Sequence, residues 1–176
     1  SFVNSNFAAA VALTAPRYGL NGSTFQGAVT LQKTDGATDN LTGGNTFQST
    51  TSITNTGSGE LNFGNTNPDI FNNNVTLTNT ATGRIQIGLN AAGNIINGNL
   101  TINHGGNSTI NAIIARNAGS TATINGTVTL NNTNTVASGG IIIAQDGAVT
   151  ISGDIIVSSN NGRGVYFGNA SGSVTQ

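Results

Sequence analysis

Residues able to carry out catalysis are few in this sequence, and they lie far apart. The chain has 6 Asp and Glu, 5 Lys and Arg and a single His. Lys33, Asp35 and Asp39 share one turn, and carboxylates combined with a cation or Ca²⁺ are what polysaccharide-cleaving enzymes require. Charges in a polar turn are more typical of a solvated loop, and Asp154 stands alone in its repeat. We therefore predict no catalytic residue, no metal site and no enzyme.

The other ionisable residues also favour a structural interpretation. His104 is the only His, so neither a Ser/His/Asp triad nor a multi-His metal site can form within one chain. We interpret His104 as a turn residue. Glu60 and Arg84 fall in turns of neighbouring repeats, where a surface ion pair contributes little. Because there is no Cys, the chain has no disulfide framework and no thiol chemistry. We expect no cofactor.

A row of hydroxyl side chains is the main candidate for a binding surface. It recurs at one position of successive repeats, as Thr30, Ser52, Thr76, Thr101 and Thr129. A second row beside it comprises Gln32, Thr54, Thr78, Asn103, Asn131 and Ser158. Regular Thr rows order water in some ice-binding proteins, but Thr is also a good polar residue for any exposed strand. The second row is mixed and Ile156 interrupts the first, so a glycan- or ice-binding face is kept as the alternative function.

An eight-residue phrase positions these rows. It reads Phe-x-x-x-Val-x-Leu-Thr over residues 7–14 and occurs seven times, at intervals of 18 to 28 residues. The copies begin at Phe7, Phe25, Phe47, Phe71, Ile96, Ile124 and Ile151. A recurring unit of this size predicts a solenoid, in which each repeat forms one coil stacked on the last.

Apolar and polar residues alternate within each phrase, which is the pattern of a half-buried strand. Four positions of each phrase are predicted to point inward, and the first is its initial Phe or Ile. The third position holds Val11, Val29, Thr51, Val75, Leu100, Val128 and Ile155. A fourth holds Leu13, Leu31, Ile53, Leu77, Ile102, Leu130 and Val157. The second is small, as at Ala9, Gly27 and Gly98, and we interpret it as room for the bulky first residue. These positions predict ladders of like side chains in one continuous core.

A second strand follows the phrase in most repeats and ends at a small residue. The segments are LNFG (61–64), IQIG (85–88), IIA (113–115), IIIA (141–144) and VYFG (165–168). Polar turns rich in Asn, Gly, Asp and Ser come next, because such residues tolerate left-handed backbone conformations. Asn90, Asn117, Asp146 and Asn169 fall at similar places in these turns. We predict that they form inward-pointing hydrogen-bonded ladders, and that Asn117→Leu lowers the melting temperature.

The predicted fold class is all-β: a parallel right-handed β-helix (β-solenoid) of about seven coils of 18–28 residues, without capping elements, forming a single domain over residues 1–176. The right hand is assumed from the usual handedness of parallel crossovers. Strands about 4.8 Å apart would give a rod about 30–35 Å long. An antiparallel sandwich is the alternative, but it does not explain why matched residues recur in phase. Uncapped ends are expected to join further repeats or identical subunits.

The composition of the chain limits which classes of partner it can bind. Charged residues make up 6% of the chain and the formal net charge is −1, so a basic patch for nucleic acid is absent. No apolar run reaches the length of a membrane span. N-x-S/T sequons occur at Asn21, Asn40, Asn74, Asn99, Asn107, Asn125, Asn131 and Asn169, and such tripeptides arise by chance in a chain rich in Asn and Thr.

Several phrases resemble repeats of very large surface proteins from gliding bacteria that use type IX secretion. They are TFQGAVTLQKT, INGNLTIN and, most distinctively, NPDIFNNNVTLTNTATG. More loosely, the chain is similar to β-helical shafts of autotransporters and haemagglutinin-type adhesins, although the match weakens from Thr121 onward. The resemblance implies a bacterial extracellular or cell-surface protein. We therefore predict a structural, non-catalytic solenoid that forms the shaft of an adhesin or fibre and stacks end to end.

Overall fold

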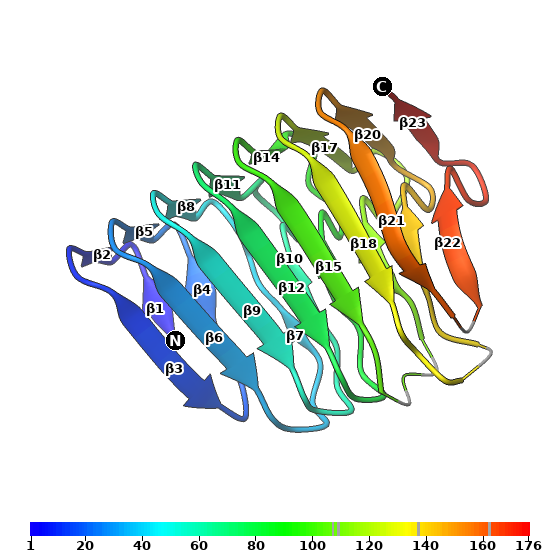
Figure 1. The fold of residues 1–176 in the computed structure, drawn as a ribbon. Helices are drawn as coiled ribbons and strands as arrows, with labels where there is room; N and C mark the ends of the chain where they lie inside the picture. Colours follow the sequence, from blue (N-terminus) through cyan, green and yellow to red (C-terminus); the bar gives the residue numbers. More distant parts are fainter. Residues whose placement is uncertain (107, 109, 137, 162) are drawn as a thin grey trace.

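The chain folds into a right-handed parallel β-solenoid of about six turns (Figure 1). The computed structural model describes residues 1–106, 108, 110–136, 138–161 and 163–176. Asn107, one of the sequon residues, lies outside this described part. Strands that follow one another in a sheet belong to successive coils, and every pairing among the described strands is parallel. The predicted fold class and hand are therefore confirmed, with about six turns instead of the predicted seven coils, and no helix is present in the described residues.

Three continuous sheets run along the axis. The long sheet contains β3 (Val11–Ala15), β6 (Val29–Lys33), β9 (Thr51–Asn55), β12 (Val75–Asn79), β15 (Leu100–His104), β18 (Val128–Asn132) and β21 (Ile155–Asn160). The top sheet contains β2 (Asn6–Phe7), β5 (Thr24–Phe25), β8 (Thr46–Phe47), β11 (Ile70–Phe71), β14 (Asn94–Ile96), β17 (Thr121–Ile124), β20 (Ala148–Ile151) and β23 (Ser173–Thr175). The back sheet contains β7 (Asp39–Asn40), β10 (Leu61–Phe63), β13 (Ile85–Ile87), β16 (Ala112–Ile114), β19 (Gly140–Ile143) and β22 (Gly164–Phe167). Near the N-terminus, β1 (Phe2–Val3) pairs with β4 (Leu20–Asn21).

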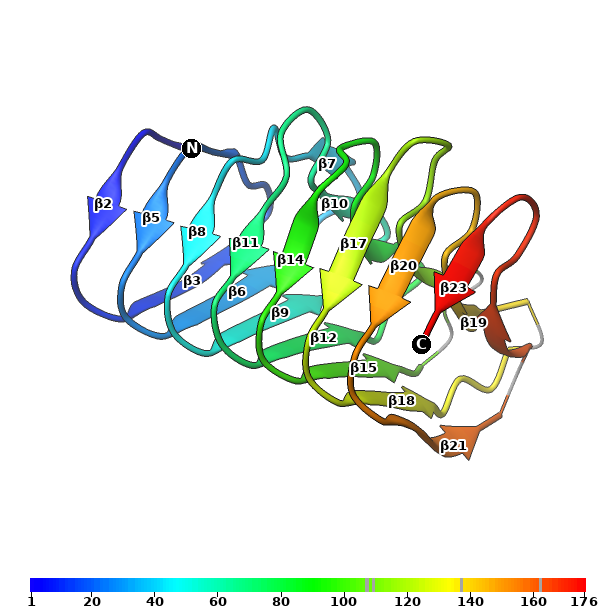
Figure 2. The ribbon, with the colours of Figure 1, turned by 90° about the horizontal axis from the view of Figure 1, so that it is seen from above.

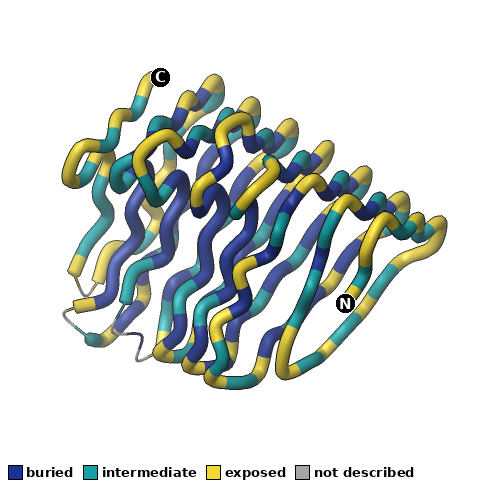
Figure 3. The backbone as a smooth tube through the Cα atoms, turned by 180° about the vertical axis from the view of Figure 1, so that it is seen from behind, coloured by how far each residue is buried: buried dark blue, intermediate teal, exposed yellow. Residues whose placement is uncertain are grey.

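The long sheet and the back sheet face each other, and the top sheet closes one side between them (Figures 1 and 2). Each repeat phrase supplies a top strand and a long strand, and the second strand of the repeat supplies the back sheet. Burial follows this arrangement: the back strands β10, β13 and β16 are buried throughout, and the long strands of the inner coils alternate buried and partly exposed positions (Figure 3). The side chains between the three sheets therefore form one continuous packed core along the axis.

Stacked Phe rings form the first part of this core. Phe7, Phe25, Phe47 and Phe71 lie in register, with successive ring centroids 4.9, 5.0 and 4.6 Å apart and nearly parallel planes. Ile96 and the equivalent residues of later coils continue the same column and are buried. Parallel pairing in register brings equivalent side chains of adjacent coils together, so like side chains must pack on like. The predicted ladder of first inward residues is confirmed.

The third and fourth inward positions also point into the core, with one departure at Val157. That side chain is 44% exposed, whereas its register partner Leu130 is fully buried. Val157 lies on β21, the last strand of the long sheet, and the register shifts immediately after this pair. The exposure arises because no described strand pairs with the outer edge of β21.

The second position is small for a different reason from the one predicted. Gly27 lies in the turn between a top strand and a long strand, where a Cβ would approach the Ala10 backbone nitrogen to 2.4 Å. A Cβ at Gly98 would approach the Asn73 carbonyl carbon to 2.4 Å. The prediction of an inward position leaving room for Phe or Ile is wrong, because these residues allow turns of adjacent coils to pack backbone to backbone.

The small residue at the end of each back strand has a conformational role. Gly64, Gly88 and Gly168 have φ angles of 64°, 77° and 67°, and Ala115 and Ala144 adopt 52° and 64°. This left-handed conformation is costly for most residues and nearly free for Gly. The repeated small residue therefore marks the point where the chain turns from the back sheet towards the top sheet.

Candidate functional site

The predicted hydroxyl row forms one column on the outer face of the long sheet. Strand register pairs its members in sequence, as Thr30, Ser52, Thr76, Thr101 and Thr129. Thr30 is exposed and the other four are partly exposed. Ala12 precedes the row in register and Ile156 follows it. The row is therefore a continuous neutral surface that offers hydroxyl donors and acceptors.

The second row is in register up to Asn131 and then shifts. The Asn131 side-chain amide donates to Asn103 Oδ1 at 2.7 Å. Asn131 pairs with Ser159 instead of Ser158, and Ser158 Oγ donates to Asn131 Oδ1. Side-chain amides that bond to one another along the axis have less capacity for a ligand. The two rows can order water or bind a hydroxyl-rich surface, and they contain no group that would activate a nucleophile.

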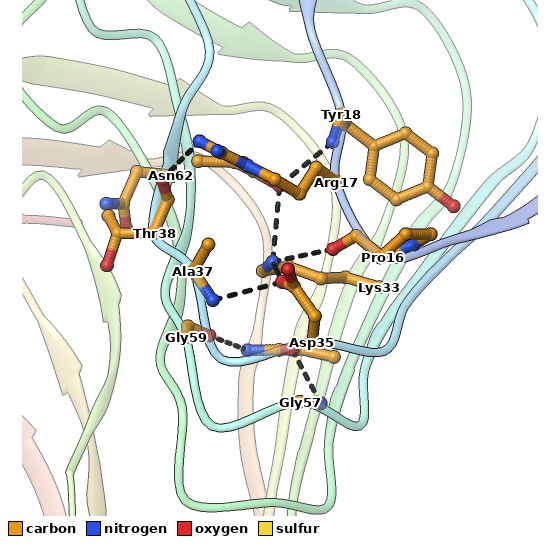
Figure 4. Close-up of polar contacts among 12 residues, drawn as sticks. Pro16, Arg17, Tyr18, Lys33, Asp35, Ala37, Thr38, Gly57, Gly59 and Asn62 are labelled. Atoms are coloured by element: carbon orange, nitrogen blue, oxygen red, sulfur yellow. Dashed lines mark hydrogen bonds and ion pairs between the residues drawn. The ribbon is translucent and has the colours of Figure 1, made fainter.

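The Lys33 turn is a buried ion network, so its prediction as a solvated loop is wrong (Figure 4). The Lys33 side chain is fully buried and Asp39 is 3% exposed. Lys33 Nζ lies 2.5 Å from Asp35 Oδ1 and 3.2 Å from Asp39 Oδ2, and it donates to the Pro16 carbonyl at 2.9 Å. Lys33 ends β6 and points inward in phase with Val29 and Leu31, which is why it is buried.

The two carboxylates of this network differ in their surroundings. Asp39 also accepts from Arg17 Nε at 3.0 Å and from the Tyr18 backbone N–H at 2.9 Å. Asp35 is partly exposed, and its hydrogen bond from Lys33 lowers the pKa of that carboxyl. Every charged group in the network has a partner of opposite sign. The ion pairs of this cluster therefore compensate buried charges at register positions where later coils have Asn and Leu. Each acid and base of the cluster is engaged in an ion pair.

A second ion cluster lies on the outer face of the back sheet. Arg84 Nη1 lies 3.2 Å from Glu60 Oε1, which is the pair expected from sequence, and Arg116 Nη1 lies 3.2 Å from Glu60 Oε2. Desolvation lowers the pKa of Arg84. Beside this cluster, the Gln86 side-chain amide is buried, and neither its nitrogen nor its oxygen has a hydrogen-bond partner among the described residues.

A column of buried polar side chains lies at the ends of the long strands, and its burial was not predicted from the sequence. This long-sheet column comprises Lys33, Asn55, Asn79, His104 and Asn132, which are in register and fully buried. The Nδ2 groups of Asn55 and Asn79 donate to the carbonyls of Gly59 and Gly83, four residues on, at 2.9 and 2.7 Å. The interpretation of His104 as a turn residue is wrong, because it is the last residue of β15. The signal was present: each column residue continues the alternation of inward Val and Leu.

A second buried column lies where the chain enters the top strands. This top-sheet column comprises Ser23, Asn45, Asp69 and Asn94. The backbone N–H groups of Ser23, Asn45 and Asp69 donate to the side-chain oxygens of Asn45, Asp69 and Asn94 respectively, at 2.9–3.0 Å. Asp69 also accepts from Asn45 Nδ2 and the Gly64 N–H. Burial is the main cause that raises the pKa of Asp69 to about 6.

The predicted turn ladder exists in part, and it points outward. Asn117 Nδ2 donates to Asn90 Oδ1, and Asn90 Nδ2 donates to Asn65 Oδ1, both at 2.6 Å and at exposed positions. Asp146 instead accepts from Ser171. The inward orientation was therefore wrong, because these residues follow the left-handed turn residue and project away from the core.

The C-terminal face has an open hollow of about 600 Å³. Its lining is Ile155, Phe167, Gly168, Gly172, Ser173, Val174 and Gln176. Phe167 is 40% exposed there, although it is in register with the buried Ile143. The hydroxyl groups of both tyrosines bond to the backbone: Tyr18 donates to the Leu13 carbonyl and Tyr166 to the Arg163 carbonyl. The hollow therefore presents the same side-chain columns that pack against the next coil elsewhere in the stack.

The fold and the surface together define an all-β parallel solenoid that is rich in Asn and Thr. Comparisons with protein-family models, with curated proteins and with solved structures found no match. Within the described residues there is no group of three or more His, Cys, Asp or Glu placed to hold a metal ion. The same part of the chain contains no helix long and apolar enough to cross a membrane.

Proposed function

We propose that this chain is a structural, non-catalytic segment of a bacterial extracellular shaft, belonging to an adhesin or a fibre, and that it stacks end to end with further coils or copies. The observation that carries the proposal is the continuity of the three sheets and their core ladders along the axis. A rod of this kind resists bending because each coil is hydrogen bonded to the next through three sheets.

The terminal faces support the stacking part of the proposal. At the C-terminal face, Ile155, Phe167 and Val174 border the open hollow, and the outer edges of β21, β22 and β23 pair with no described strand. At the other face, Phe2, Phe7, Val11 and Leu13 are partly buried and in phase with the same core columns. Unpaired edges with apolar side chains favour addition of another strand. A further coil would extend all the ladders.

Self-association of the purified chain tests this proposal. We expect sedimentation velocity and negative-stain electron microscopy to show rods that lengthen with protein concentration at constant width. Phe167→Asp should block this growth, because it places a charge in the hollow. Thr30→Asp is the matched control, because it adds the same charge on the side of the rod. Monomers at every concentration, together with isolated short particles in native material, would contradict the shaft.

A glycan- or ice-binding face is the alternative, and the unbroken register of Thr30, Ser52, Thr76, Thr101 and Thr129 favours it. Thr76→Lys would interrupt this row at its centre. Under the alternative, a glycan array or an ice-shaping assay would give a signal with the wild-type chain that the variant loses. Under the shaft proposal, neither assay gives a signal that depends on Thr76.

A further inference from the structure

His104 sits between two side-chain amides that both present nitrogen to its ring. Asn134 Nδ2 lies 3.2 Å from His104 Nε2, and Asn79 Nδ2 lies 3.4 Å from His104 Nδ1. All three side chains are fully buried. Neutral imidazole has one acceptor nitrogen and one N–H, so it can accept a hydrogen bond from one of these amides only.

Other hydrogen bonds fix the orientation of both amides. Asn134 Nδ2 donates to the Ser108 carbonyl at 2.6 Å, and Asn134 Oδ1 accepts from the Val136 N–H at 2.9 Å. Asn79 Nδ2 donates to the Gly83 carbonyl at 2.7 Å and to Ser108 Oγ at 3.2 Å. Rotating either amide to present its oxygen to the ring would break these bonds. The ring therefore faces two amide donors in fixed positions.

These bonds connect turns of three successive coils. Asn79 ends β12, His104 ends β15 and precedes the turn that contains Ser108, and Asn134 lies in the turn after β18. Ser108 bonds with both asparagines, and its Oγ donates to the Ile110 carbonyl at 2.8 Å. A change at His104 therefore affects the attachment of the turns after β15 and β18.

We infer that His104 is an acid-sensitive joint of the solenoid: the neutral ring ties these turns together, and protonation releases them. An imidazolium has two N–H groups and no acceptor, so each N–H points at an amide donor and the one hydrogen bond that the neutral ring accepts is lost. The sheets would remain intact on either side of the joint. The inference concerns this cluster alone and does not depend on the proposed shaft function.

No neighbouring charge offsets this effect among the described residues that bond or contact the ring. The groups facing it from β12, the turn after β15 and the turn after β18 are Asn79, Ser108 and Asn134, all neutral. Asn132 is its register partner on β18 and is also neutral. Burial alone lowers the pKa of His104 to about 4.

An NMR titration of the imidazole tests the inference directly, because the chain has a single His. We expect the ring to stay neutral through pH 6.5 and to titrate well below that value. Hydrogen exchange, corrected for intrinsic rates, should then show faster exchange in peptides spanning the turns after β15 and β18 as the ring charges. Peptides from β6, β9 and β12 should keep their protection.

His104→Asn is the matched variant, since Asn occupies the register positions before and after it. The variant should keep both turns protected at the acidic pH that opens them in the wild-type chain. A ring that titrates near 6.5 without opening the turns would overturn the inference. Equal acid opening in the wild-type chain and the variant would also overturn it. The wild-type titration decides the question even if the variant does not fold.

Discussion

The two buried polar columns satisfy the backbone in different ways. In the long-sheet column, the Nδ2 groups of Asn55 and Asn79 donate to carbonyls four residues later, in the turn of the same coil. In the top-sheet column, Asp69 and Asn94 accept from backbone N–H groups of the preceding coil. The first column therefore donates to carbonyls of the turns, both in its own coil and in the next one, since Asn55 Nδ2 also donates to the Arg84 carbonyl. The second column accepts backbone N–H groups between coils where the chain bends. A solenoid needs both, because buried backbone groups at its corners have no ladder partner.

Each column also contains one buried ionisable side chain that has no partner of opposite charge among the described residues, and the two side chains differ in type. His104 lies in the long-sheet column and Asp69 in the top-sheet column, and neither forms an ion pair among the described residues. Burial favours the neutral form of each, so it lowers the pKa of His104 to about 4 and raises that of Asp69 to about 6. The same physical cause therefore gives the two columns opposite responses to pH.

Asn94→Ala should have the largest effect of the substitutions that separate the columns. It removes the acceptor for the Asp69 N–H and the donor to the Ala91 and Thr121 carbonyls. Losing these three hydrogen bonds, with the buried Asp69 N–H left without its acceptor, should lower the free energy of unfolding by about 4 kcal/mol, and the melting temperature by roughly 8–16 °C. Thermal unfolding followed by circular dichroism measures both values.

Asn97→Ala is the control for Asn94→Ala, since it changes the same residue type three positions away on the outside. The Asn97 side chain bonds with the exposed Asn72 and Asn125 side chains. We expect a loss within about 0.5 kcal/mol. Equal losses in the two variants would mean that the top-sheet column does not hold adjacent coils together.

Asp69→Asn should change the pH dependence of stability. The folded pKa of Asp69, about 6, lies above its unfolded value, so its contribution is complete below about pH 4 and is lost as pH rises through 6. A shift of about two units corresponds to about 3 kcal/mol. His104 has the opposite sign: its contribution is complete above pH 6.5 and is lost as pH falls through 4.

These opposing slopes predict a nearly flat stability profile for the wild-type chain between about pH 4 and 6.5. Asp69→Asn should make stability rise with pH across that window, and His104→Asn should make it fall. Melting temperatures measured at half-unit pH steps would show both trends. Parallel profiles for the two variants would be inconsistent with opposite roles of the columns.

Lys33→Asn tests whether Asn, which occupies this position of the long-sheet column in later coils, can replace Lys33 in the early coils. Asp39 would lose Lys33 but keep Arg17 and the Tyr18 N–H. Because Asp39 keeps these two partners, one of them a cation, we expect a loss of about 2 kcal/mol, below the roughly 3–5 kcal/mol for breaking an isolated buried pair. Urea unfolding gives the value, and Arg163→Asn on the exposed surface is the charge-matched control. An unchanged midpoint would show that the ion network is dispensable.

Asn117→Leu should have the smallest effect. It removes the exposed hydrogen bond to Asn90 and leaves the backbone of the turn in place. We expect a loss of about 0.5 kcal/mol, equal to roughly 1–2 °C in melting temperature. A loss as large as that of Asn94→Ala would show that the outward ladder is as important as the buried columns.

The repeat predicted the stacked sheets and the Phe, Val and Leu ladders, because an in-phase apolar pattern has few other solutions. It did not predict which polar residues are buried. Asn79 and Asn117 are the same residue type in polar surroundings, yet one continues an inward strand position and the other follows a left-handed turn residue. Lys33 and Asp39 were assigned to a solvated loop because charge usually indicates exposure. Their burial depends on contacts with Pro16, Arg17 and Tyr18 of the preceding coil, which spacing alone does not reveal. The hydroxyl row lies in register on the long sheet, and a binding role for it stays a prediction.

Electron microscopy of native material containing this chain is the most direct test of a continuous structural shaft. We expect rods or filaments of constant width whose axial repeat is the strand spacing of about 4.8 Å. Compact isolated particles without axial continuation would contradict it.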